Sequence, residues 1–122
     1  MSEKLAFLIS SATLPEFCVT PLVHALAGRA LEAEVEIHFA GPAVRMLVDG
    51  QADLLYATPE KEKSIGDFLR ELQHAGATLY ACSMAQAQWL AAGEVLLPGC
   101  QSAGATAFIA RALADDWQTL IY

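Results

Sequence analysis

Short apolar runs alternate along this chain with segments whose apolar residues recur at helical spacing. Apolar runs of this length are typical of buried strands, whereas apolar positions at i, i+3, i+4 and i+7 indicate amphipathic helices. Their alternation predicts βα units and a mainly parallel sheet. We expect residues 78–82 to form the central strand. The other predicted strands cover residues 4–11, 34–40 and 117–122, with a loop or short extended piece within 96–103.

Residues 34–40 alternate between apolar and polar side chains. The apolar side chains share one face of the predicted strand, and Glu34, Glu36 and His38 share the other. A strand with one polar face is typical of a sheet with one side in water. We therefore expect this strand nearer an edge of the sheet, with His38 solvated like the other histidines of the chain.

Capping residues mark where the predicted helices begin. Ser64 and Asp67 form a weak capping box before an amphipathic segment. Ser83 and Gln86 form a second capping box, for a helix that runs to about residue 92. Three more helices are predicted: residues 20–33 with Thr20 as N-cap and Pro21 at the first position, residues 41–50, and residues 105–112.

The composition indicates a globular chain with an apolar surplus. The 122 residues are 55% hydrophobic and 17% charged, which suits a single domain over residues 1–122 with one core. A small domain with few charges leaves apolar surface uncovered, so we expect a homo-oligomer. The net charge of −7 disfavours a nucleic-acid partner, because an acidic surface repels phosphates.

Neither a membrane segment nor an export signal is expected. The longest stretch without Asp, Glu, Lys or Arg, residues 72–93, is too polar to span a bilayer, and the apolar run near the N-terminus is too short for a leader. The three cysteines have no metal-ligand spacing and do not suggest a disulfide framework. We expect a cytoplasmic protein with reduced thiols, no membrane partner and no cofactor.

Cys82 is the strongest candidate for chemistry. It ends a predicted buried strand and precedes a predicted helix. The carboxyl ends of parallel strands are where ligands bind in open α/β sheets, and a helix N-terminus favours the thiolate form of cysteine, which is the form that attacks sulfur. The alternative interpretation is a small buried hydrophobic residue, the usual role of a free cysteine.

The other two cysteines are weaker candidates. Cys18 falls in a predicted loop over residues 12–20, at the same edge of the sheet as Cys82, unless the first helix begins earlier, at Pro15. From there Cys18 would resolve or receive sulfur from Cys82, and mild oxidation would join the two. The alternative is a hydrophobic residue flanking the helix. Cys100 follows Pro98 and Gly99 in a loop, where no chemistry is expected.

The segment Tyr80-Ala81-Cys82-Ser83-Met84 resembles the cysteine motif of the DsrE/DsrF-like family. Residues 104–108 and the end of the chain resemble that family's closing helix and strand. The resemblance implies a five-stranded parallel sheet between helices, a flavodoxin-like three-layer α/β domain. It also implies an oligomer, for which we expect a trimer or hexamer, and persulfide transfer on Cys82. The segment 98–102 departs from the family pattern.

The leading hypothesis is therefore a sulfur carrier or sulfurtransferase-like protein that exchanges sulfur with donor or acceptor proteins through a persulfide at Cys82, with Cys18 as a weaker second site residue. Two rival hypotheses remain open. The chain is a noncatalytic subunit in which Cys82 is structural, or it is a small-ligand-binding module of the same fold.

Overall fold

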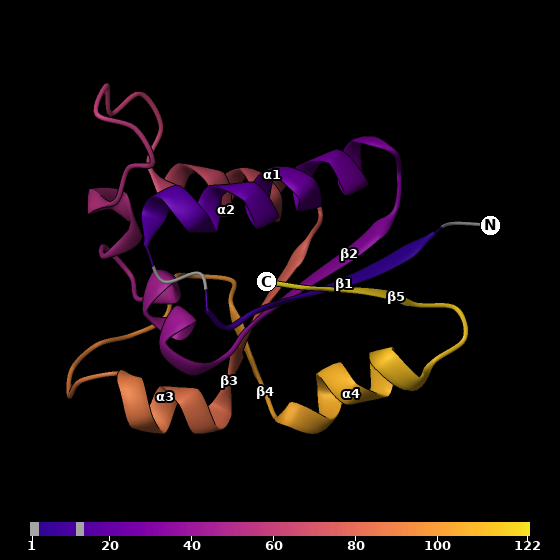
Figure 1. The fold of residues 1–122 in the computed structure, drawn as a ribbon. Coiled ribbons are helices and arrows are strands. Elements are labelled where there is room, and N and C mark those ends of the chain that lie inside the picture. Colours follow the sequence, from indigo (N-terminus) through magenta and orange to yellow (C-terminus); the bar gives the residue numbers. More distant parts are fainter. Residues whose placement is uncertain (1–2, 12–13) are drawn as a thin grey trace.

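The computed structural model describes residues 3–11 and 14–122. Its five strands form one sheet of order β4-β3-β2-β1-β5, and every neighbouring pair is parallel (Figure 1). Helices lie on both sides of the sheet, so the predicted three-layer α/β fold is confirmed. The strands are β1 (Lys4–Ile9), β2 (Glu34–Phe39), β3 (Thr78–Cys82), β4 (Gln101–Ala103) and β5 (Gln118–Ile121).

The central strand is β2, which pairs with β1 on one side and with β3 on the other. The predictions that β2 lies near an edge and that residues 78–82 form the central strand are therefore wrong. Glu36 is only 5% exposed and His38 only 6%. Helix α4 (Ala105–Leu113) covers the face of β2 that was expected to meet water, and Arg111 and Phe108 from this helix contact Glu36 and His38.

The opposite face of the sheet carries α1 (Pro15–Ala30) and α2 (Ile65–His74), which lie side by side (Figure 1). Helix α1 begins at Pro15, the earlier of the two starts that the sequence offered. A proline suits the first turn of a helix, where its missing N–H would have no partner. Cys18 therefore lies inside α1 and not in a loop, and Thr20 is not an N-cap. Residues 12–13 of the predicted loop lie outside the described residues.

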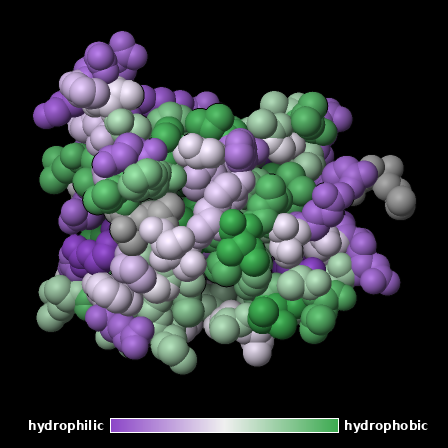
Figure 2. Space-filling view, viewed as in Figure 1, coloured by the Kyte–Doolittle hydropathy of each residue, from purple (hydrophilic) through white to green (hydrophobic). Residues whose placement is uncertain are grey.

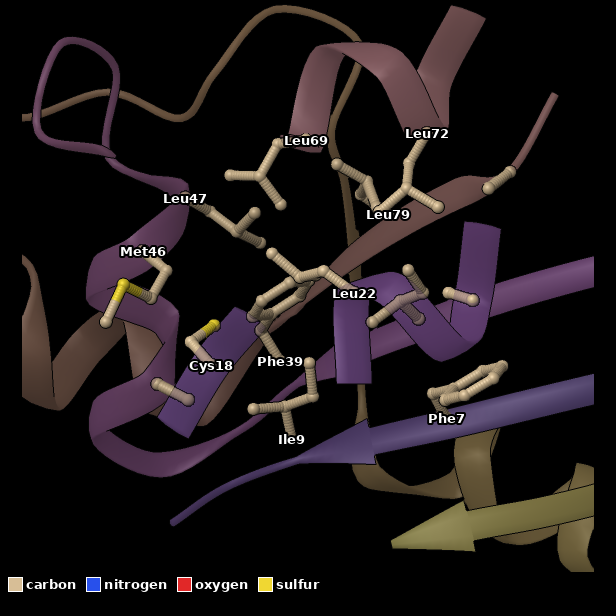
Figure 3. Close-up of a cluster of buried hydrophobic side chains, with 14 of the residues drawn as sticks. Phe7, Ile9, Cys18, Leu22, Phe39, Met46, Leu47, Leu69, Leu72 and Leu79 are labelled. Carbon is tan, nitrogen blue, oxygen red and sulfur yellow. The ribbon is translucent and has the colours of Figure 1, made fainter. Parts of the chain in front are cut away.

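The core between the sheet and these two helices is apolar. Figure 3 shows its side chains interlocking from the strands and from both helices. The capping box predicted for α2 is present: the backbone N–H of Asp67 donates to Ser64 Oγ at 3.0 Å, and the backbone N–H of Ser64 donates to Asp67 Oδ2 at 3.1 Å. Fully buried members of the core include Phe7, Ile9, Cys18, Leu22, Phe39, Leu69, Leu72 and Leu79.

The remaining connections lie near the carboxyl edge of the sheet. The predicted helix over 41–50 is a 3₁₀ helix, η1 (Gly41–Leu47), and a short η2 (Ala52–Leu54) follows it. Helix α3 (Ser83–Trp89) starts directly after β3, but the predicted capping box is absent because Cys82 is the N-cap and makes no side-chain cap. The Gln86 amide instead donates to the Ala81 carbonyl at 3.2 Å and to Ser102 Oγ at 2.9 Å, which ties α3 to β4.

Among the described residues, no helix is both long enough and apolar enough to cross a membrane.

Candidate active site at the carboxyl edge of the sheet

A cavity of about 180 Å³ opens at the carboxyl ends of β2, β3 and β4, beside the start of α4. Among the described residues that line it, only His38 and Cys82 supply a side-chain nitrogen or sulfur atom, and the others carry hydrocarbon side chains or none. The carboxyl edge of a parallel sheet is the usual ligand-binding edge of open α/β folds. The lining residues are Leu8, His38, Phe39, Ala40, Cys82, Ala103, Gly104, Ala105, Phe108 and Ile109.

Cys82 is the last residue of β3, where it pairs with Ala103 of β4. The strand is a run of apolar residues that Gly76, in the left-handed conformation with φ of 98°, separates from α2. The thiol is half-buried and free of any disulfide. The structure thus places Cys82 at the end of its strand and in the wall of a cavity, where a small molecule can reach it.

Cys18 does not line this cavity. It is completely buried in the core between α1 and the sheet (Figure 3). Burial raises the pKa of the Cys18 thiol to about 12. Cys100 is half-buried in the loop before β4, and burial raises the pKa of its thiol to about 11. Thiols that stay protonated are poor nucleophiles, so neither residue shares the chemical setting of Cys82.

A partly buried ionic network flanks the cavity under α4. Arg111 donates to both carboxylate oxygens of Glu36, from Nε at 3.0 Å and from a terminal nitrogen at 2.8 Å. His38 Nε2 lies 3.2 Å from the same carboxylate. The Arg111 guanidinium also stacks over the ring of Trp117 at 4.2 Å. These contacts fix α4 to the sheet and leave Glu36 with three hydrogen bonds.

Two aromatic rings hold the His38 imidazole in place. Tyr80 stacks on it with ring centroids 4.8 Å apart and an interplanar angle of 19°. Phe108 meets it edge-on at 5.4 Å. Packing of this kind restricts the ring to one orientation. His24 and His74, by contrast, are exposed as expected, and His24 lies on α1 with its Nδ1 2.6 Å from the Tyr122 hydroxyl.

The electrostatics of the network follow from burial and pairing. Burial by itself would raise the pKa of Glu36, but the hydrogen bonds from Arg111 and His38 outweigh it and hold that pKa below its ordinary value. Burial lowers the pKa of His38 below its ordinary value of 6.5, and the contact with Glu36 only partly offsets this. At neutral pH the site therefore contains an ionised carboxylate and a neutral imidazole.

Sequence patterns alone did not predict this network. The alternation of β2 predicts one face exposed to water, but the same alternation also suits a strand that is covered by helices on both sides. A usable signal was present in α4, where Phe108 and Arg111 are three residues apart and so share a helix face. Among the described residues, no group of three or more His, Cys, Asp or Glu side chains is arranged to hold a metal ion.

The fold and the site define a three-layer α/β domain with one thiol in a cavity at the carboxyl edge of its parallel sheet. The chain belongs to the DsrE/DsrF-like family, whose model matches residues 3–118. This confirms the family resemblance over nearly the whole chain.

Two solved structures share the fold over 100% of both chains. The ychN protein from E. coli has a TM-score of 0.79 and 17% sequence identity to this chain. A protein of unknown function from Methanobacterium thermoautotrophicum, MTH1491, has a TM-score of 0.66, also at 17% identity. No curated protein matches this sequence.

Proposed function

We propose that this protein relays sulfur through a persulfide on Cys82. The observation that carries the proposal is that Cys82 lines the cavity at the ligand-binding edge of the sheet, whereas Cys18 and Cys100 do not. Membership of the DsrE/DsrF-like family supports sulfur relay as the broad function. The partners we propose are proteins that donate sulfane sulfur to Cys82 or accept it.

The proposed step moves one sulfur atom without an added oxidant or reductant. The Cys82 thiolate attacks the terminal sulfur of a donor persulfide, R–S–SH. The donor's S–S bond breaks as a new S–S bond forms at Cys82, and the donor leaves as a thiolate that takes up the proton lost by Cys82. The products are Cys82–S–SH and R–SH. A second thiol then removes the sulfur by the same reaction.

The test is mass spectrometry of the protein after incubation with a sulfane-sulfur donor. We expect the parent protein to gain the mass of one sulfur atom on the peptide that contains Cys82, and we expect reductant to remove it. Cys82→Ser is nearly isosteric, so it should fold and should not gain sulfur. Cys100→Ser is the matched control and should load like the parent. Equal loading of Cys82→Ser and the parent would show that Cys82 is not the acceptor.

Failure of the parent to load from any donor would favour a noncatalytic subunit. The apolar lining of the cavity supports a further alternative, a binding site for a small apolar molecule. A thermal-shift screen separates these two readings, because a ligand that binds only the folded state raises the melting temperature. Cavity-lining Phe108 offers the control: Phe108→Leu should weaken any shift caused by a ligand in this cavity.

We also propose a homo-oligomer, a trimer or hexamer. Figure 2 shows hydrophobic surface gathered over α4 and near the end of β5. Leu113 on α4 is 79% exposed and Ile121 on β5 is 68% exposed. Apolar patches of this kind often mark interfaces between subunits. Light scattering at micromolar concentration should report the oligomer, Leu113→Glu should weaken it, and a monomeric parent would contradict it.

A further inference from the structure

His38 and Cys82 lie on the same face of neighbouring strands. His38 in β2 pairs directly with Tyr80 in β3, and Cys82 is the next residue of β3 on that face. In a regular parallel sheet this diagonal relation separates the Cα atoms by roughly 8 Å. Both side chains line the same cavity. One water molecule or one substrate atom between them would connect the imidazole to the thiol.

The hydrogen bond to Glu36 decides which nitrogen of His38 faces that space. An ionised carboxylate only accepts hydrogen bonds, so Nε2 of the neutral ring carries the proton and donates it to Glu36 Oε1. Nδ1 then keeps its lone pair. Glu36 precedes His38 in β2, so Nε2 points back along the strand. Nδ1 lies on the other edge of the ring, so an Nε2 directed at Glu36 leaves Nδ1 directed away from that carboxylate.

The contacts of His38 support an Nδ1 that faces the cavity. The only side-chain hydrogen bond of His38 among the described residues is the one from Nε2. Within that part of the chain, no buried side-chain nitrogen or oxygen lacks a hydrogen-bond partner. These two facts support an Nδ1 that meets the cavity, which is the space that His38 lines.

We propose that His38 is the base that accepts the proton of the Cys82 thiol, directly or through one water molecule in the cavity, with Glu36 and Arg111 as positioning residues that hold the imidazole with Nδ1 free. This inference deepens the sulfur-relay proposal and rests on it for the identity of the substrate. The transfer of the Cys82 proton to His38 does not depend on the substrate, so it can be tested with any electrophile that reacts with the thiol.

The proton balance closes within the site. Nδ1 takes the proton as the Cys82 sulfur attacks the terminal sulfur of R–S–SH, and the donor's S–S bond breaks. The imidazolium formed in this step is stabilised by the carboxylate of Glu36 at its other nitrogen. It then returns the proton to the departing R–S⁻, which leaves as R–SH. No electrons are exchanged with an outside reagent.

The groups around His38 set the direction of the pH dependence. Glu36 from its own strand, Tyr80 and Cys82 from β3, and Arg111 from α4 are the titratable or charged side chains that face it. Burial raises the pKa of Tyr80, so its hydroxyl stays protonated and uncharged near neutral pH. His38 loses its role as a base only when it is protonated, and burial has moved its pKa below 6.5. The base is therefore available throughout the neutral range.

The experiment measures the rate of Cys82 alkylation by iodoacetamide and the rate of sulfur loading, each as a function of pH. With a base in place, both rates should be nearly constant above the titration of His38. His38→Phe keeps the aromatic packing against Tyr80, and His38→Gln keeps a donor to Glu36. Neither variant has a base, so both rates should instead rise with each pH unit as the thiol itself ionises. At pH 7 we expect them to be roughly tenfold slower than the parent, because a free thiol is only a few per cent ionised there.

His24→Gln is the matched control and should keep the profile of the parent, because His24 lies on α1 away from the cavity. The proposal is supported if the parent rates do not change with pH in the neutral range and if both His38 variants lose this behaviour. It is overturned if both variants keep rates that do not change with pH. The parent provides a check that needs no variant: a rate that rises steadily through the neutral range, without a break at the His38 titration seen by NMR, would also overturn it.

The two proposals fail in different ways. If no protein loads sulfur but alkylation shows the parent profile and its loss in the His38 variants, sulfur relay falls and the role of His38 stands. If loading depends on Cys82 but has the same pH profile with and without His38, sulfur relay stands and the base is excluded.

Discussion

The two faces of the sheet differ in almost every physical respect. The face under α1 and α2 is a continuous apolar core without a buried charge among its members. The face under α4 has a much smaller apolar cluster, around Ala6, Phe108 and Trp117. It also holds the ion pair between the buried Glu36 and the half-buried Arg111, the neutral His38 and the cavity with Cys82. The larger core lies on the α1 and α2 side of the sheet. The candidate reactive residues lie on or beside the α4 side.

This difference indicates a division of labour within one small domain. An apolar core stabilises the fold through burial and close packing. A carboxylate buried in an ion pair adds little net stability compared with an apolar residue of similar size, because it loses its water. The polar face therefore contributes little to the free energy of folding, and the apolar face supplies most of it. Substitutions on the two faces should separate stability from reactivity.

The largest effect on stability is expected for Leu79→Ala. Leu79 is completely buried on the α2 side of β3, next to Tyr80, which faces the other way. Removing its side chain leaves a cavity in the core and should cost about 3 kcal/mol of unfolding free energy in a urea titration. The alkylation rate of Cys82 in the folded protein should stay unchanged. A changed rate with only a small loss of stability would contradict the division between the faces.

A smaller loss is expected for Glu36→Gln. The substitution keeps the shape of the side chain but leaves Arg111 and His38 without their charged acceptor. We expect the unfolding free energy in the same urea titration to fall by about 1–3 kcal/mol. The lower end of this range is expected because Arg111 is partly exposed to water. Unlike Leu79→Ala, this variant should also alter the pH profile of Cys82 alkylation. Trp117, stacked on Arg111, gives a fluorescence signal for the loosening of α4.

The smallest effect is expected from acid. Because the pKa of His38 is lowered on folding, the unfolded chain binds its proton first, and stability falls as pH drops below the ordinary value of 6.5. The pKa of Glu36 is also lowered, so a second fall begins below about 4.5. Melting temperatures measured from pH 8 to pH 4 should show the first decline in the parent and not in His38→Phe. His74→Phe, at an exposed position of α2, is the control and should decline like the parent.

Local signals in the sequence were enough to predict much of the fold. The apolar run of β3 lies between Gly76 and Ser83, which fixed both of its ends. Ser64 and Asp67 correctly marked the start of α2, because a capping box involves only neighbouring residues. The early start of α1 was left open, since both Pro15 and Pro21 fit the first turn of a helix. The position of Cys82 at the end of its strand was also predicted correctly.

The partner of the thiol could not be predicted in the same way. His38 and Cys82 are far apart in the sequence, and only the pairing of β2 with β3 brings them to one face. The period of β2 shows that Glu36 and His38 share a side but does not show what covers that side. The covering helix comes from the last part of the chain, and its Arg111 makes burial of a carboxylate possible.

The brevity of β4 has a consequence for how large molecules reach the thiol. This edge strand has three residues, is held by β3 on one side only, and supplies Ala103 to the cavity wall. Segments with few backbone hydrogen bonds open locally at a much lower free energy than the centre of a sheet. We therefore expect amide protons of β4 to exchange with deuterium much faster than those of β2. Such breathing would let the thiol meet a protein partner while the rest of the molecule stays folded.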